Sequence, residues 1–233
     1  LQVSDKGETV NWLCPSQPQN LTAEKDAIRE LVKNYNVDGV HLDYIRYNDG
    51  HTCFCAACRD AYARDSGRAP ASWPPAAADW PARKEYYRWR CGQITRFVRD
   101  VSVLARAIRP GIRISAAVYG KYPSCVEGVG QDWAAWLRDG YVDFVCPMNY
   151  TANVAQFADY VRAQMALPGA AGRVYPGIGV TALESRLDAV QVVDEIRALR
   201  NEGAPGFALF DLNRVLEREV FPTLSLGITR PGH

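Results

Sequence analysis

An acidic residue at the end of a short apolar segment is the first candidate for chemistry in this sequence. Residues 37–43 read VDGVHLD, and strand alternation would place His41 and Asp43 on one face, opposite Val40 and Leu42. A carboxylate and an imidazole buried side by side are destabilising unless both are hydrogen-bonded. We therefore interpret Asp43 either as a working carboxylate or as part of an ion-pair network that only stabilises the fold.

The residues around Asp43 and at later strand ends carry groups that recognise sugars. Two phenols and the Arg46 guanidinium follow Asp43 directly, and such groups stack on sugar rings, hydrogen-bond to hydroxyls or clamp carboxylates. Later apolar segments end in further aromatic and amide side chains. The predicted substrate-binding residues are His41, Tyr44, Arg46, Tyr47, Tyr119, Asn149 and Tyr150.

Carboxyl groups near an aromatic cleft suit glycoside hydrolysis. One carboxyl group protonates the leaving oxygen, and a second acts as nucleophile or base. Asp43 is the best-placed acid, and Asp211 and Glu184 are the only others close to predicted strand ends. The sequence contains no HExxH motif, phosphate-binding glycine loop or Ser-His-Asp order. The predicted catalytic residues are therefore Asp43, Asp211 and Glu184.

The cysteines predict either a metal site or disulfides. The chain has seven cysteines, and an odd number cannot all pair internally. Cys53, Cys55 and Cys58 form a CxCxxC cluster, with Cys14 as a candidate fourth member. Zinc accepts four sulfurs tetrahedrally, whereas in an exported protein the same residues could form disulfides. A structural zinc ion and disulfides remain equal alternatives, free thiols are the third, and no cofactor is expected for catalysis.

The elements that position these residues follow a strand–helix rhythm. Short apolar segments typical of buried parallel strands occupy residues 37–43, 112–119, 142–149, 174–180 and 207–211. Helical patterns occupy residues 22–35, 83–108, 132–137, 154–165, 187–199 and 213–220. The last four strands begin 30–33 residues apart, which indicates repeated right-handed βα units.

The first strand–helix unit is longer and contains an insertion. Its 75-residue interval leaves an excess of roughly 40 residues, which we assign to about residues 48–81. This segment contains the CxCxxC cluster and a stretch rich in Pro, Ala and Trp, so we expect an irregular excursion over one end of the sheet. We expect one domain over residues 1–233 that carries this insertion.

Composition excludes several classes of protein. The 233 residues include 27 Lys+Arg and 26 Asp+Glu, so no basic nucleic-acid surface or polybasic membrane anchor organises the chain. No apolar run of about 18 residues is present, which excludes a membrane span. The length lies just below the roughly 250 residues of a complete (β/α)8 barrel. Because the chain begins with Leu1, we expect a processed or truncated product.

Four segments, in order, resemble family-ten glycosyl-hydrolase-like proteins, also known as family 10 glycosylhydrolases. Residues 35–47 are similar to the strand-four signature of that family, and residues 12–18 to the segment before its helix three. Residues 143–151 resemble its strand six, and residues 53–59 a cysteine-rich loop found in a subset. The resemblance implies a (β/α)8 TIM barrel that acts on carbohydrate and is usually exported from bacteria.

The resemblance also implies which part of the barrel is present. The chain would hold strands four to eight, with the other strands supplied by another segment or chain. The strand-four acid would be Asp43, and the polar end of strand six would be Asn149. Many members carry a second acid after the strand-four motif, but Tyr44 follows Asp43 here.

The resemblance favours a secreted or periplasmic glycoside hydrolase that cleaves a polysaccharide, without nucleic-acid or membrane partners. One alternative is a non-catalytic carbohydrate-binding or structural barrel without a competent acid pair. Another is a different hydrolase or lyase on the same scaffold, because a fold does not fix its chemistry.

Overall fold

The computed structural model describes residues 1–229 and contains two compact units. Unit 1 comprises Leu1–Ser115 and Pro123–Val142, and unit 2 comprises Ala116–Tyr122 and the chain from Asp143 onward. Strand β4 (Arg113–Tyr119) begins in unit 1 and ends in unit 2.

The main sheet has five strands in chain order, β3-β4-β5-β6-β7. The pairs β5–β6 and β6–β7 are parallel. Besides β4, these strands are β3 (Gly39–Leu42), β5 (Phe144–Met148), β6 (Gly177–Gly179) and β7 (Ala208–Phe210). Strands in sequential order with helices between them form an open part of a (β/α)8 barrel. All five predicted strands are present, and each is shorter than its apolar segment.

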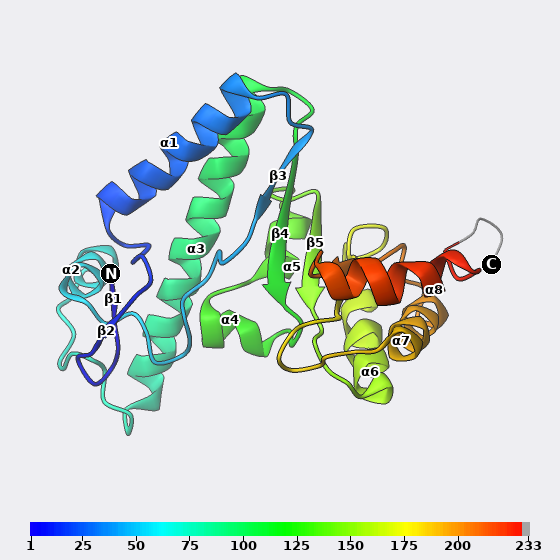
Figure 1. Ribbon diagram of the computed structural model, residues 1–233. Helices are drawn as coiled ribbons and strands as arrows, with labels where there is room; N and C mark the ends of the chain where they lie inside the picture. The colour runs from blue at the N-terminus through cyan, green and yellow to red at the C-terminus, as the bar shows by residue number, and fades with distance from the viewer. Residues whose placement is uncertain (230–233) are drawn as a thin grey trace. The chain divides into compact units, whose positions relative to one another are not determined.

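Two long helices form the frame of unit 1. Helix α1 (Pro18–Asn34) packs against α3 (Trp80–Ile108), and Figure 1 shows them side by side. Both begin three or four residues before the predicted positions because proline fits the first turn of a helix, where its missing N–H costs nothing. The Asp79 carboxylate caps α3 by accepting a hydrogen bond from the Ala82 N–H at 3.2 Å.

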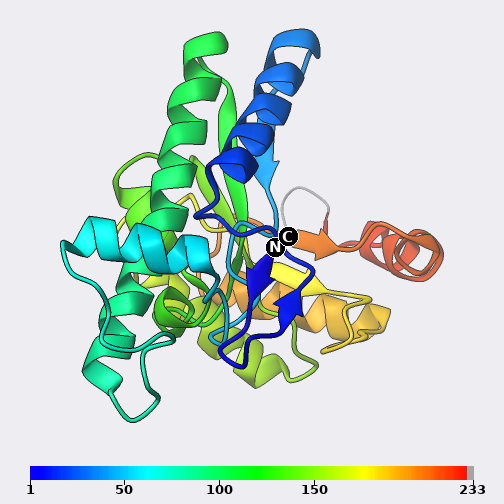
Figure 2. The ribbon, with the colours of Figure 1, turned by 90° about the vertical axis from the view of Figure 1, so that its left-hand side faces the viewer.

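The predicted irregular insertion is partly helical, which corrects the expectation from the sequence. It contains α2 (Ala56–Ser66), which ends at Gly67 in the left-handed conformation, and its last residues begin α3. Alanine-rich composition explains the helix, although the cysteines and prolines around it concealed the pattern. Figure 2 looks onto α2 and a small antiparallel hairpin made by β1 (Gln2–Val3) and β2 (Thr9–Val10).

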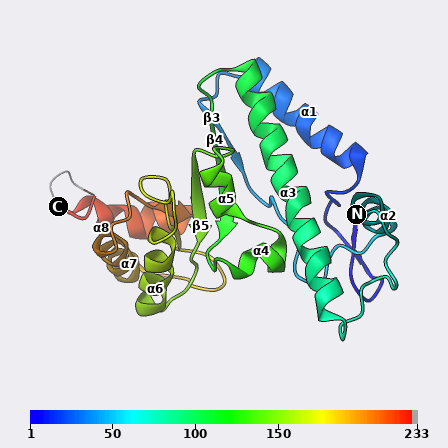
Figure 3. The ribbon, with the colours of Figure 1, turned by 180° about the vertical axis from the view of Figure 1, so that it is seen from behind.

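The remaining helices of unit 1 are short and pack on α3. They are α4 (Ser124–Val129) and α5 (Trp133–Arg138), both visible beside α3 in Figure 3. The Asp132 carboxylate caps α5 by accepting a hydrogen bond from the Ala135 N–H at 3.2 Å. Trp133 and Trp136 are completely buried.

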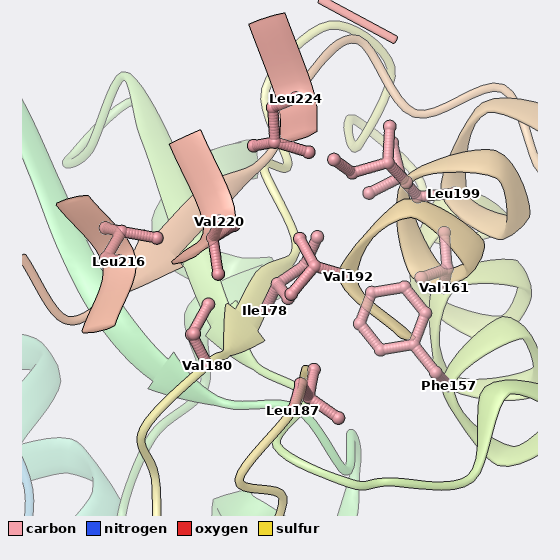
Figure 4. Close-up of a cluster of buried hydrophobic side chains, with 11 residues drawn as sticks. Phe157, Val161, Ile178, Val180, Leu187, Val192, Leu199, Leu216, Val220 and Leu224 are labelled. Atoms are coloured by element: carbon pink, nitrogen blue, oxygen red, sulfur yellow. The ribbon is translucent and has the colours of Figure 1, made fainter. Parts of the chain in front are cut away.

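Unit 2 is built around an apolar core to which β6 contributes. Helix α6 (Val154–Met165) packs against α7 (Ala189–Asn201), followed by a π-helical turn η1 (Leu216–Val220) and α8 (Phe221–Ser225). Asp188 and Gln191 form a reciprocal capping box on α7. Figure 4 shows aliphatic side chains and one phenylalanine converging: Phe157, Val161, Ile178, Val180, Leu187, Val192, Leu199, Leu216, Val220 and Leu224.

Candidate functional site

The end of β3 presents its polar residues away from the core. Val40 and Leu42 are each 7% exposed, whereas His41 and Asp43 lie on the opposite face, as alternation predicts. The His41 Nδ1 atom lies 2.8 Å from Ser115 Oγ on β4. Desolvation lowers the pKa of His41, although the nearby Asp43 charge acts in the opposite direction. His41 is therefore suited to a neutral hydrogen-bonding role.

The chain turns sharply directly after Asp43. Tyr44 adopts a left-handed conformation with φ of 54°, which costs about 1–3 kcal/mol for a residue other than glycine. The Tyr44 N–H donates to Asp43 Oδ1 at 2.7 Å, and the Tyr44 carbonyl accepts from the Arg46 N–H at 2.8 Å. Such strain is concentrated at functional sites, and here it directs an exposed phenol beside the carboxylate.

Trp12, Tyr44 and Arg46 form a compact group next to Asp43. The rings of Trp12 and Tyr44 meet edge to face, with centroids 5.2 Å apart. The Arg46 guanidinium lies 4.5 Å from the Trp12 centroid and 5.2 Å from that of Tyr44, within the range of cation–π attraction. Trp12 begins the segment 12–18 that resembles the family, but the resemblance gives it no role, and the tertiary structure places it in this group.

These residues line a pocket of about 440 Å³ within unit 1. Its polar lining includes Asp43, Arg46 and Glu24, and its apolar lining includes Ile28 and Phe97. Concave sites with an apolar wall and a few convergent polar groups are typical of small-ligand binding. No ion pair in residues 1–229 involves Asp43, so Arg46 does not lock this carboxylate. The sequence did not predict Glu24, because it lies mid-helix on α1.

The other predicted acids belong to unit 2. Asp211 follows β7 and accepts hydrogen bonds from the Thr181 hydroxyl and, at 2.8 Å, from Asn213 Nδ2. The Asp211 N–H also donates to Thr181 Oγ1 at 3.3 Å. Glu184 is exposed in the segment after β6. Asp211 is thus a hydrogen-bonded, oriented carboxylate, whereas Glu184 lies at the surface.

The predicted substrate-binding residues of unit 2 differ in accessibility. Asn149 is 1% exposed and exchanges two hydrogen bonds with Gln164, at 2.7 and 3.0 Å. Gln164 also donates to the Gly120 carbonyl at 2.9 Å. The Gln164 amide on α6 therefore links Gly120, after β4, to Asn149, after β5. Tyr150 stacks on Phe210 with centroids 5.3 Å apart, and Tyr119 is 38% exposed.

Tyr47 occupies a different place from the one predicted. Its side chain is completely buried in unit 1, so it presents no surface to a sugar. The Arg90 guanidinium lies 4.6 Å from the Tyr47 ring centroid, and the Tyr47 hydroxyl has no hydrogen-bond partner among residues 1–229. The turn at Tyr44 breaks the strand alternation, which explains why spacing alone misplaced this residue.

The four predicted cysteines converge at one buried point of unit 1. The Sγ atoms of Cys14, Cys53, Cys55 and Cys58 all lie within 4.8 Å of one another. Cys14 Sγ is 3.5 Å from both Cys55 Sγ and Cys58 Sγ. Zinc–sulfur bonds of about 2.3 Å place tetrahedral sulfurs about 3.8 Å apart, so this set fits a metal ion. All seven cysteines, which lie within residues 1–229, are free thiols rather than disulfides.

Hydrogen-bond donors surround the sulfurs. The Val3 N–H donates to Cys53 Sγ at 3.3 Å, and the Ser16 N–H donates to Cys14 Sγ at 3.4 Å. Hydrogen bonding with Cys14 is the largest effect lowering the pKa values of Cys53 and Cys55. Hydrogen bonding with the neighbouring cysteines raises the pKa values of Cys14 and Cys58, so the metal-free cluster holds protons that metal binding would release.

Comparison with known families confirms the resemblance seen in the sequence. The family model described as "Glycosyl hydrolase-like 10" matches residues 2–171. No curated protein matches the chain.

Solved structures with a similar fold are glycosidases of low sequence identity. The glycoside hydrolase domain of PgaB (BpsB) from Bordetella bronchiseptica is 16% identical with a TM-score of 0.73, over 88% of this chain and 62% of that domain. A β-galactosidase from Bacillus circulans sp. alkalophilus is 14% identical with a TM-score of 0.66, over 95% of this chain and 39% of that one. Bee venom hyaluronidase, solved with a hyaluronic acid tetramer, is 15% identical with a TM-score of 0.55, over 96% and 82%.

These comparisons establish the fold class. The chain is a partial (β/α)8 barrel, as predicted, and it spans less than two thirds of the PgaB domain. None of the helices in residues 1–229 combines the length and apolar character needed to cross a membrane.

Proposed function

Because this chain belongs to the glycosyl hydrolase-like 10 family, we propose that it is the carbohydrate-cleaving part of a glycoside hydrolase. The observation that carries the proposal is the arrangement of side chains at the end of β3. There, the Asp43 carboxylate forms no ion pair with any of residues 1–229 and lines a pocket together with Trp12, Tyr44 and Arg46. Aromatic faces stack on sugar rings, and arginine donates to hydroxyls or carboxylates. Asp43 is the essential carboxylate in this mechanism.

A second carboxyl group is required, and Asp211 and Glu184 are the candidates. In a retaining reaction this second carboxyl group forms a covalent intermediate, and in an inverting reaction it activates a water. The hydroxyl and amide donors around Asp211 suit a carboxylate that remains ionised as nucleophile or base. The exposed position of Glu184 suits a group that exchanges protons with solvent. His41, Tyr44, Arg46, Tyr119 and Tyr150 are the proposed sugar contacts.

A non-catalytic carbohydrate-binding barrel is the second candidate. It is favoured by the hydrogen bonds that occupy Asn149 and Asp211, which leave fewer polar groups for a reacting sugar. The same pocket would then bind a polysaccharide without cleaving it.

The test is a screen of the intact protein against a panel of polysaccharides, with release of reducing ends as the readout. The proposal expects cleavage of at least one polysaccharide, lost in Asp43→Asn and retained in Asp26→Asn, a control on the exposed side of α1. Binding without cleavage in the wild type would favour the binding barrel. Unchanged cleavage by Asp43→Asn would remove Asp43 from the mechanism.

We also propose that the cysteine cluster binds one structural zinc ion. The four converging sulfurs and the N–H donors around them support it. When bound, the ion would link the segment before α1 to the start of α2. Metal analysis of protein purified without chelator should find one zinc per chain, lost in Cys58→Ser and kept in the control Cys146→Ser. Intact disulfides with little metal would overturn the zinc site.

We further propose that the protein acts in the periplasm or outside the cell. We also propose that barrel strands one to three come from another segment or chain, because this chain covers only 62% of the PgaB domain. Cell fractionation tests the location. The origin of strands one to three is tested by whether this chain is recovered together with a second barrel segment, either in one complex or in one polypeptide.

A further inference from the structure

A completely buried glutamine lies at the start of the chain, on strand β1. Its side-chain amide donates from Gln2 Nε2 to the Leu13 carbonyl at 3.0 Å and accepts from the Asn48 N–H through Oε1 at 3.3 Å. The Gln2 main-chain N–H donates to the Trp12 carbonyl at 2.7 Å. A buried amide is costly without partners, but it offers a donor and an acceptor in one planar group. Gln2 therefore joins a carbonyl on one segment to an N–H on another.

Both segments that Gln2 joins contribute to the pocket at the end of β3. Trp12 and Leu13 line the pocket from the first segment, and Arg46 lines it from the second. The Asn48 carbonyl accepts from Arg46 Nη1 at 3.2 Å, and the Arg46 guanidinium lies 4.5 Å from the centroid of the Trp12 ring. These contacts therefore form a closed circuit that starts and ends at Gln2.

Strand β1 is itself paired on both sides. It pairs with β2 on one side. On the other side, the Val3 carbonyl accepts from the Phe54 N–H at 2.7 Å, and the Val3 N–H donates to Cys53 Sγ at 3.3 Å. Residues 11–14, in contrast, belong to no helix or strand. Because β1 is fixed by its own pairing, Gln2 can hold this irregular segment in place.

We propose that Gln2 is a positioning residue for sugar binding in the pocket at the end of β3. It holds the Trp12 ring against the Arg46 guanidinium, and it lies outside the pocket lining, so it acts through Trp12 and touches no sugar. This role rests on the proposed binding of sugar to the pocket. Without the Gln2 amide, the Trp12 ring gains freedom that sugar binding must then remove, which lowers the affinity.

Fluorine NMR of the intact protein labelled with 5-fluorotryptophan tests the position of the Trp12 ring without any sugar. The chain has six tryptophans, and Trp12→Phe identifies the Trp12 resonance. Gln2→Met keeps the size of the side chain but removes its donor and its acceptor, so the Trp12 resonance should shift or broaden while the others stay in place. Gln19→Met, at an exposed position on α1, is the matched control and should leave all the resonances unchanged.

A second variant keeps the test decisive if Gln2→Met does not fold. The carboxyl group of Gln2→Glu keeps the acceptor for the Asn48 N–H, and only its protonated form can donate to the Leu13 carbonyl. The Trp12 resonance of this variant should therefore move towards the wild-type position as the pH falls. A resonance that stays at the wild-type position at every pH would contradict the role of Gln2.

Calorimetric titration measures the effect on sugar binding, with the panel polysaccharide that the wild type cleaves or binds best as the probe. All variants carry Asp43→Asn, so that the polysaccharide is bound and not cleaved. Trp12→Ala should raise the Kd about 10-fold, because one stacking ring is lost, and Gln2→Met should raise it about 5-fold. Val161→Ala, in the core of unit 2, is the control for lost stability and should leave the Kd of the folded protein unchanged.

The double variant distinguishes a positioning role from a purely structural one. In a Trp12→Ala background, Gln2→Met should raise the Kd by less than about 2-fold, because the ring through which Gln2 acts is absent. Additive effects of the two substitutions would overturn the role of Gln2, as would an unchanged Trp12 resonance in Gln2→Met, and both results would leave the proposed function standing. A wild type that binds no polysaccharide would overturn the proposed function and the role in sugar binding together.

Discussion

Two aspartates follow parallel strands of this protein, and their surroundings differ sharply. Asp43, after β3, accepts one hydrogen bond, from the adjacent Tyr44 N–H, and lines a pocket with aromatic walls. Asp211, after β7, accepts from Thr181 and Asn213, whose side chains hold it in place. The position after a strand is therefore not sufficient to define a catalytic acid. The number of donors already bonded to a carboxylate determines how many of its hydrogen-bond acceptor sites remain for a substrate.

The largest expected effect is on catalysis at Asp43. The same substitution, Asp to Asn, at both positions tests the comparison directly. Asp43→Asn should lower kcat on the order of a thousand-fold or more, because the carboxylate is lost. Its thermal stability should barely change, because the asparagine oxygen still accepts from the Tyr44 N–H. A large drop in melting temperature with intact activity would reverse the roles of the two aspartates.

A third carboxyl group, Glu195 on α7, sharpens the comparison because it is buried without any partner. Both of its oxygens are unsatisfied among the described residues, and desolvation raises its pKa from 4.5 to about 8. The folded state keeps the proton while the unfolded state releases it, so stability present below about pH 4.5 is lost as the pH rises towards 8. The loss between pH 5 and 8 should be roughly 2–4 kcal/mol.

Glu195→Gln is the variant for this test, because it cannot ionise. Urea unfolding across the same pH range should show a flatter stability profile than that of the wild type. Its kcat–pH profile should match that of the wild type, since Glu195 lies on a helix rather than at a strand end. A shifted kcat–pH profile would mean that Glu195 takes part in catalysis.

A smaller effect is expected for the stability of Asp211→Asn. The amide still accepts from Thr181 and Asn213, but the hydrogen bonds lose their charge assistance, which costs about 1 kcal/mol. Denaturant unfolding should show this loss, whereas Glu184→Gln, at an exposed position, should change stability by less than about 0.5 kcal/mol. If Asp211→Asn were as stable as wild type, the donors around Asp211 would not be structural.

The smallest effect concerns the strained turn beside Asp43. Tyr44→Gly removes the steric cost of the left-handed conformation, so the free energy of unfolding should change by less than about 1 kcal/mol. Sugar binding should nevertheless weaken, because the exposed ring is lost, whereas Tyr44→Phe should retain most of it. Calorimetric titration with a polysaccharide that the wild type cleaves would measure the sugar affinity of both variants. Wild-type affinity in Tyr44→Gly would show that the ring does not contact sugar.

Much of the fold was predictable because parallel strands buried on both faces are marked by short apolar runs. The strands at Gly39–Leu42 and Arg113–Tyr119 and the helix Val154–Met165 all fell within or at their predicted ranges. Helix α2 was missed because its apolar positions are sparse and its neighbours resemble loop sequence. Within the predicted helix 213–220, only the π-helical form of Leu216–Val220 was not predictable, because no periodicity distinguishes it from an ordinary helix.

The candidate site was predictable only where the chemistry lies on one short segment. His41 and Asp43 share a strand face, so alternation alone placed them together. Trp12 lies more than thirty residues from Tyr44, and no local pattern relates the two, yet their rings are in contact.

By itself, the sequence determined the order of the strands, the acid at the end of β3 and the four cysteines that could share an ion. These follow from periodicity and from the chemistry of the side chains, which do not depend on distant contacts. Only the tertiary structure decided that the cysteines converge as free thiols and that Tyr47 faces inward. It also decided that, in the part of the chain that the structure describes, Asp43 has no ion-pair partner, whereas two side chains bond Asp211. Those outcomes depend on which side chains meet across the fold, and a left-handed turn of one residue was enough to redirect the residues that follow Asp43.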